Sequence, residues 1–170
     1  MKINKIYFGI LLVSFLTACS ISYKFTDSSI NYDVLKTVNI VNFVNQAPLV
    51  YPPLEQRFNE ELKDYFSRNT KLRFVNQNAD IEIEGEIVGY ELTPMAVQED
   101  GLASETRLTM TVRYRFRNNK QEGKDKMDQT VSAYRNFSSN RLLNDVQDQL
   151  ITELNKEIVE RFFNETMSDW

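Results

Sequence analysis

The sequence predicts one small α+β domain, in which two helices pack on one face of a mainly antiparallel, four-stranded sheet. Apolar and polar residues alternate in four segments, as they do in half-buried strands. In two other segments apolar residues recur at intervals of three and four, as on the buried face of a helix. These segments follow one another in the order β, α, β, β, β, α, and the 170 residues suffice for one domain.

Residues 1–18 have the parts of a lipoprotein signal peptide. They begin with basic residues and continue with an apolar stretch, residues 6–15, that is too short to span a bilayer. Leu16-Thr17-Ala18 then precedes Cys19, which is the lipobox pattern, and no second cysteine exists to pair with it. We expect cleavage before Cys19 and attachment of diacylglycerol and an N-acyl chain to it, which together would hold the protein on a bilayer. An ordinary signal peptide or a short membrane anchor that happens to contain this cysteine is the alternative.

Residues 19–32 are interpreted as a lipidated tether and residues 33–170 as the folded domain. Ser20 stands where an aspartate would retain a lipoprotein at the inner membrane, so we expect the periplasmic face of the outer membrane. The leader holds two lysines and no acid, so its removal changes the formal charge from −4 to −6. An acidic, exported protein is not expected to bind nucleic acid.

The first half of the domain reads as a strand, a helix and a second strand. Residues 36–44 are rich in β-branched residues and alternate roughly, and prolines then interrupt regular structure. A helix is expected from Pro53 to about Asn69. In residues 79–90 three isoleucines alternate with Glu82, Glu84 and Glu86, and Gly85 is a candidate for a β-bulge.

The second half reads as a hairpin followed by the longest helix. Residues 106–117 alternate most regularly, a polar loop covers residues 118–124, and residues 127–137 return as an antiparallel strand. The last helix is expected from Asn140 to Met167, with Ser138 or Ser139 as its cap.

The composition argues against catalysis. The chain has no histidine, and its one cysteine is assigned to lipid, so the commonest general base, thiol chemistry and the usual zinc ligands are missing. No phosphate-binding glycine loop, nucleophile elbow or calcium loop occurs either. We therefore expect no enzyme activity and no metal or cofactor besides the lipid on Cys19, and a function in binding or assembly.

An arginine row is the most conspicuous feature of the predicted sheet: Arg107, Arg113, Arg115 and Arg117 share one strand face, the last three about 6.8 Å apart per step. One interpretation is a site for the phosphorylated head of lipopolysaccharide. The alternative, which we weigh more heavily, is that Glu82, Glu84 and Glu86 pair with these arginines across two neighbouring strands.

Two further places could meet a partner protein. Pro94, Met95 and Val97 lie in a linker-like stretch and could form an exposed apolar loop. Trp170 ends the chain, and so large a ring is expected to pack either on a partner or on its own domain.

Several segments together resemble the LptE family, the lipopolysaccharide-assembly lipoproteins of the outer membrane. The resemblance covers nearly the whole mature chain, and the residue 89–98 run, Gly-Tyr-x-Leu-Thr-Pro-Met-Ala-Val-Gln, is its most distinctive part. The other matching segments are residues 19–26, 46–50, 84–88, 106–112, 142–151 and 163–166, with Trp170.

The resemblance implies a role in the outer membrane. Members of this family sit as a plug inside a large β-barrel partner, LptD, help that barrel to fold and are thought to contact lipopolysaccharide on its way to the outer leaflet. It also implies a small sheet with two helices, and basic sheet residues as lipopolysaccharide contacts, although no short motif transfers those contacts to this chain. A periplasmic carrier that holds an amphipathic ligand between sheet and helices, without a barrel, remains the alternative.

Overall fold

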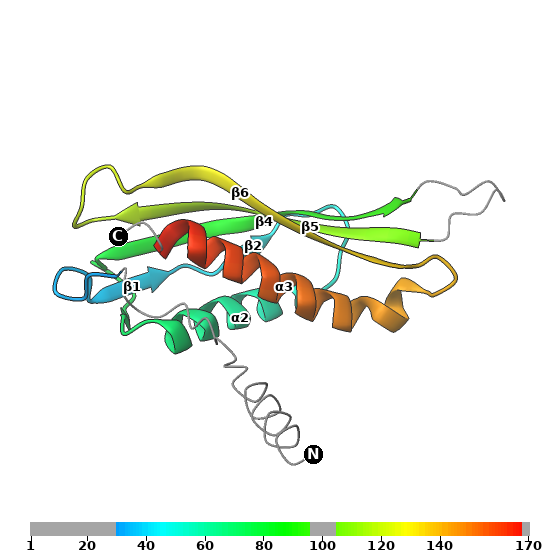
Figure 1. Cartoon of the computed structure of the whole chain (residues 1–170), viewed down its shortest axis with the longest axis horizontal. Helices are drawn as coiled ribbons and strands as arrows, with labels where there is room; N and C mark the ends of the chain where they lie inside the picture. Colours follow the sequence, from blue (N-terminus) through cyan, green and yellow to red (C-terminus); the bar gives the residue numbers. More distant parts are fainter. Residues whose placement is uncertain (1–29, 96–104, 168–170) are drawn as a thin grey trace, which may run out of the picture.

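The computed structural model describes residues 30–95 and 105–167. The predicted signal peptide, Cys19, most of the tether, Val97 and Trp170 lie outside these residues. The described part is an α+β domain with two helices and a mixed sheet, as Figure 1 shows. The expected fold class is thus confirmed, whereas the expected number of strands is wrong.

In the described part of the chain the sheet has six strands. They are β1 (Thr37–Ile40), β2 (Val44–Asn45), β3 (Arg73–Phe74), β4 (Ile81–Pro94), β5 (Glu105–Asn118) and β6 (Lys126–Ser138). Their order is β3-β1-β4-β5-β6, and β2 pairs with β4 beyond the end of β1. The three long strands form an antiparallel meander, as expected, but β1 and β2 run parallel to β4, and β1 runs parallel to β3.

The predicted strand over residues 36–44 is interrupted because Phe43 turns into the core. Phe43 is fully buried, and the side chain of Asn59 takes over the hydrogen bonds of its backbone. Phe43 N–H donates to Asn59 Oδ1 at 2.8 Å, and Asn59 Nδ2 donates to Phe43 O at 2.8 Å. The interruption separates β1 from β2. After the helix that follows, the chain returns to the same end of the sheet, which makes β1, β3 and β4 parallel.

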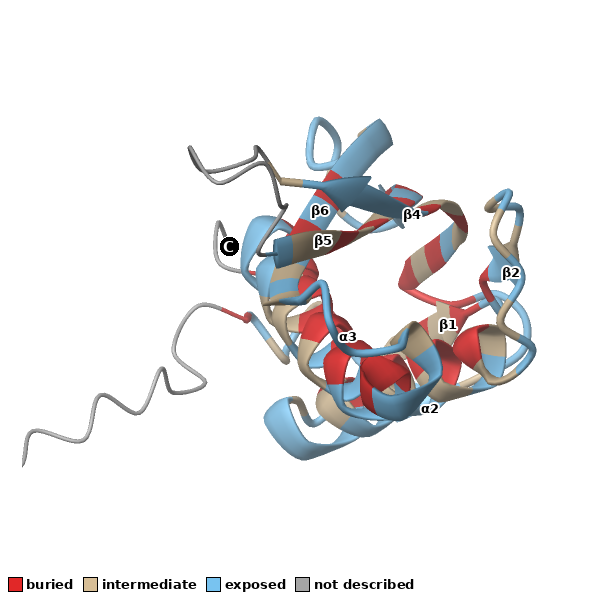
Figure 2. Cartoon of the chain, turned by 90° about the vertical axis from the view of Figure 1, so that its right-hand side faces the viewer, coloured by how far each residue is buried: buried red, intermediate tan, exposed pale blue. Residues whose placement is uncertain are grey.

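Both helices cover one face of the sheet. Helix α2 (Pro53–Asn69) begins with proline in its first turn and has the expected bounds, and α3 (Leu143–Met167) packs beside it. Figure 2 shows the buried residues on the surfaces that sheet and helices turn toward each other. The aromatic rings of Phe43, Phe58, Phe66, Tyr114 and Phe162 contact one another there.

Tyr114 ties the sheet to the end of the last helix. Its ring lies edge-on to Phe162, with centroids 4.6 Å apart, and its hydroxyl donates to Glu165 Oε2 at 2.8 Å. Burial, with the neighbouring Glu165 carboxylate, raises the pKa of Tyr114 far above its usual value. The phenol therefore stays protonated and keeps this hydrogen bond at physiological pH.

The irregularity of β4 lies after Gly85. Gly85 pairs in register with Tyr114, and the register shifts only between Ile87 and Gly89. The expectation of a bulge at Gly85 is therefore wrong. Glycine is required there by a close approach instead, because an added Cβ would overlap the ring of Phe43 and lie 2.5 Å from the carbonyl oxygen of Arg113.

The last helix begins later than the sequence indicates. Ser138 ends β6 and Ser139 lies in the turn that follows, in which Arg141 N–H donates to Ser138 O; α3 begins only at Leu143, so neither serine caps it. Ser139 instead shares a hydroxyl hydrogen bond of 3.0 Å with Thr106. Leu142, which the helical stripe included, is 72% exposed and precedes α3.

Candidate functional site

The face of the sheet that the helices leave uncovered carries the predicted arginine row. Leu108, Met110, Val112, Tyr114 and Phe116 of β5 are buried toward the helices, so the residues between them face outward. The register sets Arg113, Arg115 and Arg117 opposite Glu86, Glu84 and Glu82 of β4, respectively. Strand pairing therefore brings together the acidic and basic residues that the sequence placed on separate strands.

Arg113 and Arg117 each pair with the glutamate directly opposite. Arg113 Nε donates to Glu86 Oε1 at 3.0 Å, and Arg117 Nη1 donates to Glu82 Oε2 at 3.0 Å. Both guanidinium groups stay about half exposed, at 48% and 51% of the side-chain surface. These are the ion pairs that the alternative interpretation expected, and in surface pairs of this kind each contributes about 0–1 kcal/mol.

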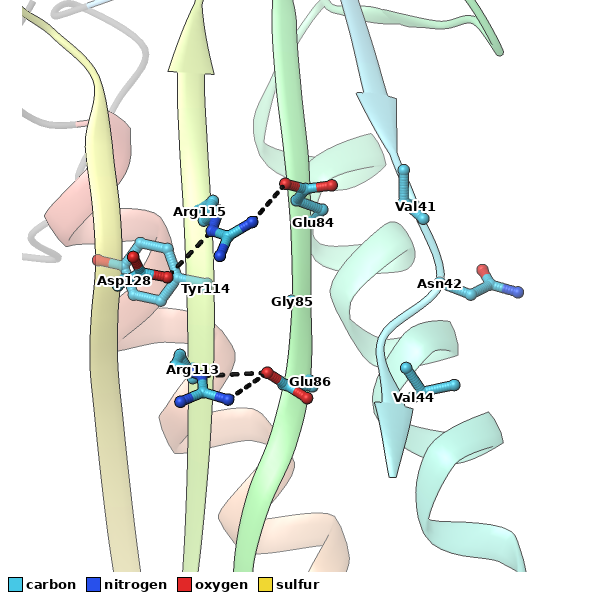
Figure 3. A pocket seen from close by; sticks show the side chains of 10 residues that line it. All are labelled: Val41, Asn42, Val44, Glu84, Gly85, Glu86, Arg113, Tyr114, Arg115 and Asp128. Carbon is cyan, nitrogen blue, oxygen red and sulfur yellow. Dashed lines mark hydrogen bonds and ion pairs between the residues drawn. The ribbon is translucent and has the colours of Figure 1, made fainter. Parts of the chain in front are cut away.

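Arg115 joins carboxylates from two strands. Its Nε donates to Asp128 Oδ1 at 3.0 Å, and its Nη1 lies 3.5 Å from Glu84 Oε1, as Figure 3 shows. The hydrogen bond and charge of Asp128, with a smaller effect of Glu84, raise the pKa of the Arg115 guanidinium above its usual value. Asp128 reaches this position from an irregular part of β6, where its φ of 52° is left-handed.

Arg107 lies apart from the other three arginines. It is opposite Asn136 of β6, and its Nε donates to Asn136 Oδ1 at 3.1 Å. Its guanidinium carbon lies 4.0 Å from the centroid of the Tyr134 ring, a cation–π contact. The row therefore consists of a cluster of three carboxylate-paired arginines and a separate arginine held by neutral groups.

Two shallow pockets adjoin the paired arginines. One, of about 280 Å³, includes Val41, Val44 and Arg113, and the other, of about 180 Å³, includes Met127 and Arg117. Val41, Glu84 and Arg115 line both pockets. The three apolar side chains are 48–50% exposed. This face thus combines half-exposed guanidinium groups with apolar patches, a mixture suited to an amphipathic, anionic ligand or to a polar protein surface.

The sequence could not predict the whole composition of this site. Asp128 joins it through a left-handed backbone conformation, which period-two alternation does not predict. Val41 faces away from the buried Val38 and Ile40, as alternation predicts, and its N–H still donates to Ile83 O at 2.9 Å. The only indication of Asp128 in the sequence was that a polar residue stands near the start of the predicted strand, close to the preceding turn.

The expected partner-contact residues are only partly described. Pro94 is exposed at the end of β4, opposite Thr106 of β5, and so belongs to the sheet rather than to a loop. Met95 is half-buried, and its N–H donates to Glu105 O at 3.0 Å. Val97 and Trp170 lie outside the described residues.

The described residues offer neither a metal cluster nor a membrane-spanning helix. Residues 30–95 and 105–167 contain no cluster of three or more side chains with which a metal could be coordinated. Neither α2 nor α3 combines the length and the apolar composition needed to cross a membrane.

Comparison with known families gives a match over most of the chain. The model of the family described as "LptE: Lipopolysaccharide-assembly" matches residues 35–166. A comparison with curated proteins gives no match.

Several solved structures are similar. An uncharacterized lipoprotein B from Nitrosomonas europaea has 15% sequence identity and a TM-score of 0.55, with 79% of this chain and 83% of that one covered. For the rare lipoprotein B from Shewanella oneidensis the identity is 14% and the TM-score 0.53, over 78% and 95% of the two chains. A minor lipoprotein from Acinetobacter baumannii has 14% identity and a TM-score of 0.51, over 80% and 95%. Identities this low establish a common fold only.

Proposed function

The chain belongs to the LptE family of lipopolysaccharide-assembly proteins, and from this premise we propose that it is a lipid-anchored plug and assembly factor of a β-barrel lipopolysaccharide translocon. The barrel would be an LptD-like protein of the outer membrane. The anchor would be the acylated Cys19 at the periplasmic face. The family match over residues 35–166 is the observation that carries this proposal.

The described domain supports a plug better than a carrier. A carrier would need a cavity between the sheet and the helices, lined by their apolar residues. Those residues pack on one another instead, with aromatic centroids 4.6–6.4 Å apart. The pockets beside the arginine row lie on the outer face of the sheet. A filled core with a broad polar face suits a rigid body that presents its surface to a partner.

No residue is proposed as catalytic. The family is one of non-enzymatic lipoproteins, and the carboxylates of the open face are engaged in ion pairs with arginines. We assign the function of the chain to binding surfaces and to the anchor.

Copurification tests the plug. Protein solubilised from membranes in mild detergent and captured through this chain should bring down a large β-barrel protein in a fixed ratio. Capture of the chain without any barrel protein would refute the proposed role.

We further assign lipopolysaccharide contact to Arg113, Arg115 and Arg117. Each is about half exposed, Arg113 and Arg117 beside one carboxylate and Arg115 between two, so a phosphate could approach from solvent and share the guanidinium donors. Val41, Val44 and Met127 would meet the apolar part of the ligand. Arg107 would contribute less, because its guanidinium already stacks on Tyr134.

A charge-reversal series tests this contact. Arg113→Glu with Arg115→Glu should weaken lipopolysaccharide binding at least tenfold and leave barrel association intact. The control, Arg141→Glu with Lys156→Glu, makes the same change in net charge at exposed positions elsewhere and should bind as the parent does.

The ion-pair alternative makes a different prediction for the same series. Adding Glu84→Arg, Glu86→Arg and Asp128→Asn to the double variant restores the pairs between β4 and β5 with reversed polarity and removes the carboxylate of β6 that would repel a glutamate at position 115. If the arginines serve stability alone, this variant with five substitutions should regain both thermal stability and lipopolysaccharide binding. Regained stability with binding still weakened would support the contact.

A further inference from the structure

The N-terminal end of the described chain lies at one end of the domain, together with a group of basic side chains. The chain enters at Ile30, which is buried in the core. β1, β3 and β4 begin at this end, α2 and α3 finish there, and the β5–β6 turn projects beside them, as Figure 1 shows. We call this region the tether end and define its basic residues as Lys36, Lys71, Arg73, Lys120, Lys124 and Lys126.

Short contacts hold several of these basic residues in one place. Arg73 N–H donates to Lys36 O at 2.9 Å, and Lys71 Nζ lies 5.2 Å from the centroid of the Tyr32 ring. Lys120 Nζ lies 3.3 Å from Asp80 Oδ1, and Asp80 Oδ2 accepts the N–H of Lys36 at 2.8 Å. These contacts join Lys36, Lys71, Arg73 and Lys120 to one another and to the first described residues.

The tether end is more basic than the rest of the protein. Its acidic residues are Asp33, Asp80, Glu122 and Asp125, so it has two more basic than acidic side chains. The whole chain, by contrast, carries a formal charge of −4. Lys36, Arg73 and Lys126 form no ion pair with other described residues. Phe74, next to Arg73, is 43% exposed, and an apolar ring beside basic residues can enter the boundary between headgroups and acyl chains.

The predicted anchor would bring the tether end close to a membrane. Ten residues separate Cys19 from Ile30, and a chain of that length reaches at most about 40 Å when fully extended. If Cys19 is acylated, the tether end is the part of the domain where the chain from the bilayer arrives. We propose that the tether end docks on anionic phospholipid headgroups and so orients the domain upright on the leaflet that holds its anchor.

This orientation rests on the proposed lipid anchor, but its consequences can be tested separately from the anchor. Docking leaves the open face of the sheet, with its arginine row, turned sideways rather than onto the bilayer, and it points the end of β4, the start of β5 and the β6–α3 turn away from the membrane. Each basic residue near an anionic leaflet contributes about 1 kcal/mol. Two such residues therefore correspond to roughly thirtyfold in affinity.

Vesicle binding of the unacylated mature chain tests the proposal without the anchor. The chain from residue 19, with Cys19→Ala, should cosediment with vesicles of phosphatidylethanolamine and phosphatidylglycerol, less so as salt increases, and not with pure phosphatidylcholine. Arg73→Glu with Lys126→Glu should weaken this binding at least thirtyfold. The control, Arg141→Glu with Lys156→Glu, has the same net charge and should bind within twofold of the parent.

A footprint on the acylated protein tests the orientation itself. In anionic liposomes Lys36 and Lys126 should be protected from an amine-acylating reagent, whereas Lys156 on α3 should react as it does in detergent. Equal losses in the two vesicle-binding variants, salt-independent binding or unprotected Lys36 and Lys126 would overturn docking. Failure of copurification with a barrel would bear on the proposed function alone.

Discussion

Gly85 shows how one residue links the core to the open face of the sheet. Its α-carbon lies opposite Tyr114, between the glutamates that pair with Arg115 and Arg113. Phe43, held by Asn59, fills the space where a side chain would be. A substitution here would displace either the ring beneath the sheet or the strand that carries the arginines.

We expect Gly85→Ala to destabilise the fold by about 1–3 kcal/mol, the usual cost of overpacking. Urea unfolding measures this directly. Gly123→Ala is the matched control, because an added methyl there meets nothing within 4 Å and only the φ of 78° opposes it. An equal or larger loss of unfolding free energy in Gly123→Ala would show that the ring of Phe43 can move aside at little cost.

Asp80 is a second residue with an outsized structural role, because it joins the start of β1 to the start of β4. Burial disfavours its charged form, but hydrogen bonds from Lys36 N–H and Thr37 N–H, and from Lys120, outweigh burial and hold the pKa of Asp80 below its usual value. A carboxyl whose pKa is lower in the folded state stabilises the fold above its unfolded pKa. That stabilisation is lost as the pH falls through the folded pKa.

Asp80→Asn should therefore lower the free energy of unfolding at pH 7 by about 1–3 kcal/mol. The difference from the parent should shrink as the pH falls below about 4. Chemical denaturation at pH 7 and pH 3 measures both effects, with Asp64→Asn, an exposed aspartate of α2, as the control. A difference that stayed constant with pH would contradict the role of the carboxylate charge.

Among the elements, β6 is the long strand at the edge of the sheet, and α3 protects it. Arg135 of β6 binds Glu153 and Glu157 of α3, at 2.9 and 2.5 Å, and Arg161 of α3 donates to the carbonyl of Ser132 at 2.8 Å. Edge strands with unoccupied backbone groups invite pairing with other chains. The arginines thus both attach the helix and occupy part of that edge.

Arg135→Gln with Arg161→Gln should loosen β6 before it affects the rest of the sheet. We expect amide hydrogen exchange in residues 131–136 to rise at least fivefold, with little change in β4. Lys156→Gln, on the exposed side of α3, serves as control. Unchanged exchange in β6 would show that side-chain packing alone holds it to the helix.

The long elements were predictable because each has one buried face. The alternation in β5 and the stripe from Val146 to Phe162 in α3 depend only on burial of one face. Such burial produces a regular spacing of apolar residues that is visible in the sequence. The short strands were not predictable in the same way. β2 and β3 have two residues each, and their parallel pairing depends on Asn59 and on the path of α2, which only the folded chain brings together. The same limit explains why Asp128 was missed at the candidate site.

For the molecule as a whole, we propose different tasks for the predicted anchor and for the domain. The domain supplies a filled core and an outer face with paired arginines, and the acylated Cys19 would keep it at the membrane. Cys19→Ala should therefore leave the precursor uncleaved by the lipoprotein signal peptidase and unlabelled by radioactive palmitate. Gel mobility and labelling in cells measure this, and persistent palmitate label in the variant would show that the lipid is attached elsewhere.

Lipopolysaccharide at the cell surface, measured after depletion of this chain, tests its assignment to lipopolysaccharide assembly most directly. We expect newly made lipopolysaccharide to stop reaching the outer leaflet and to accumulate inside the cell, with recovery when the parent chain is restored. Surface lipopolysaccharide that continued to appear at the parental rate in depleted cells would contradict the account.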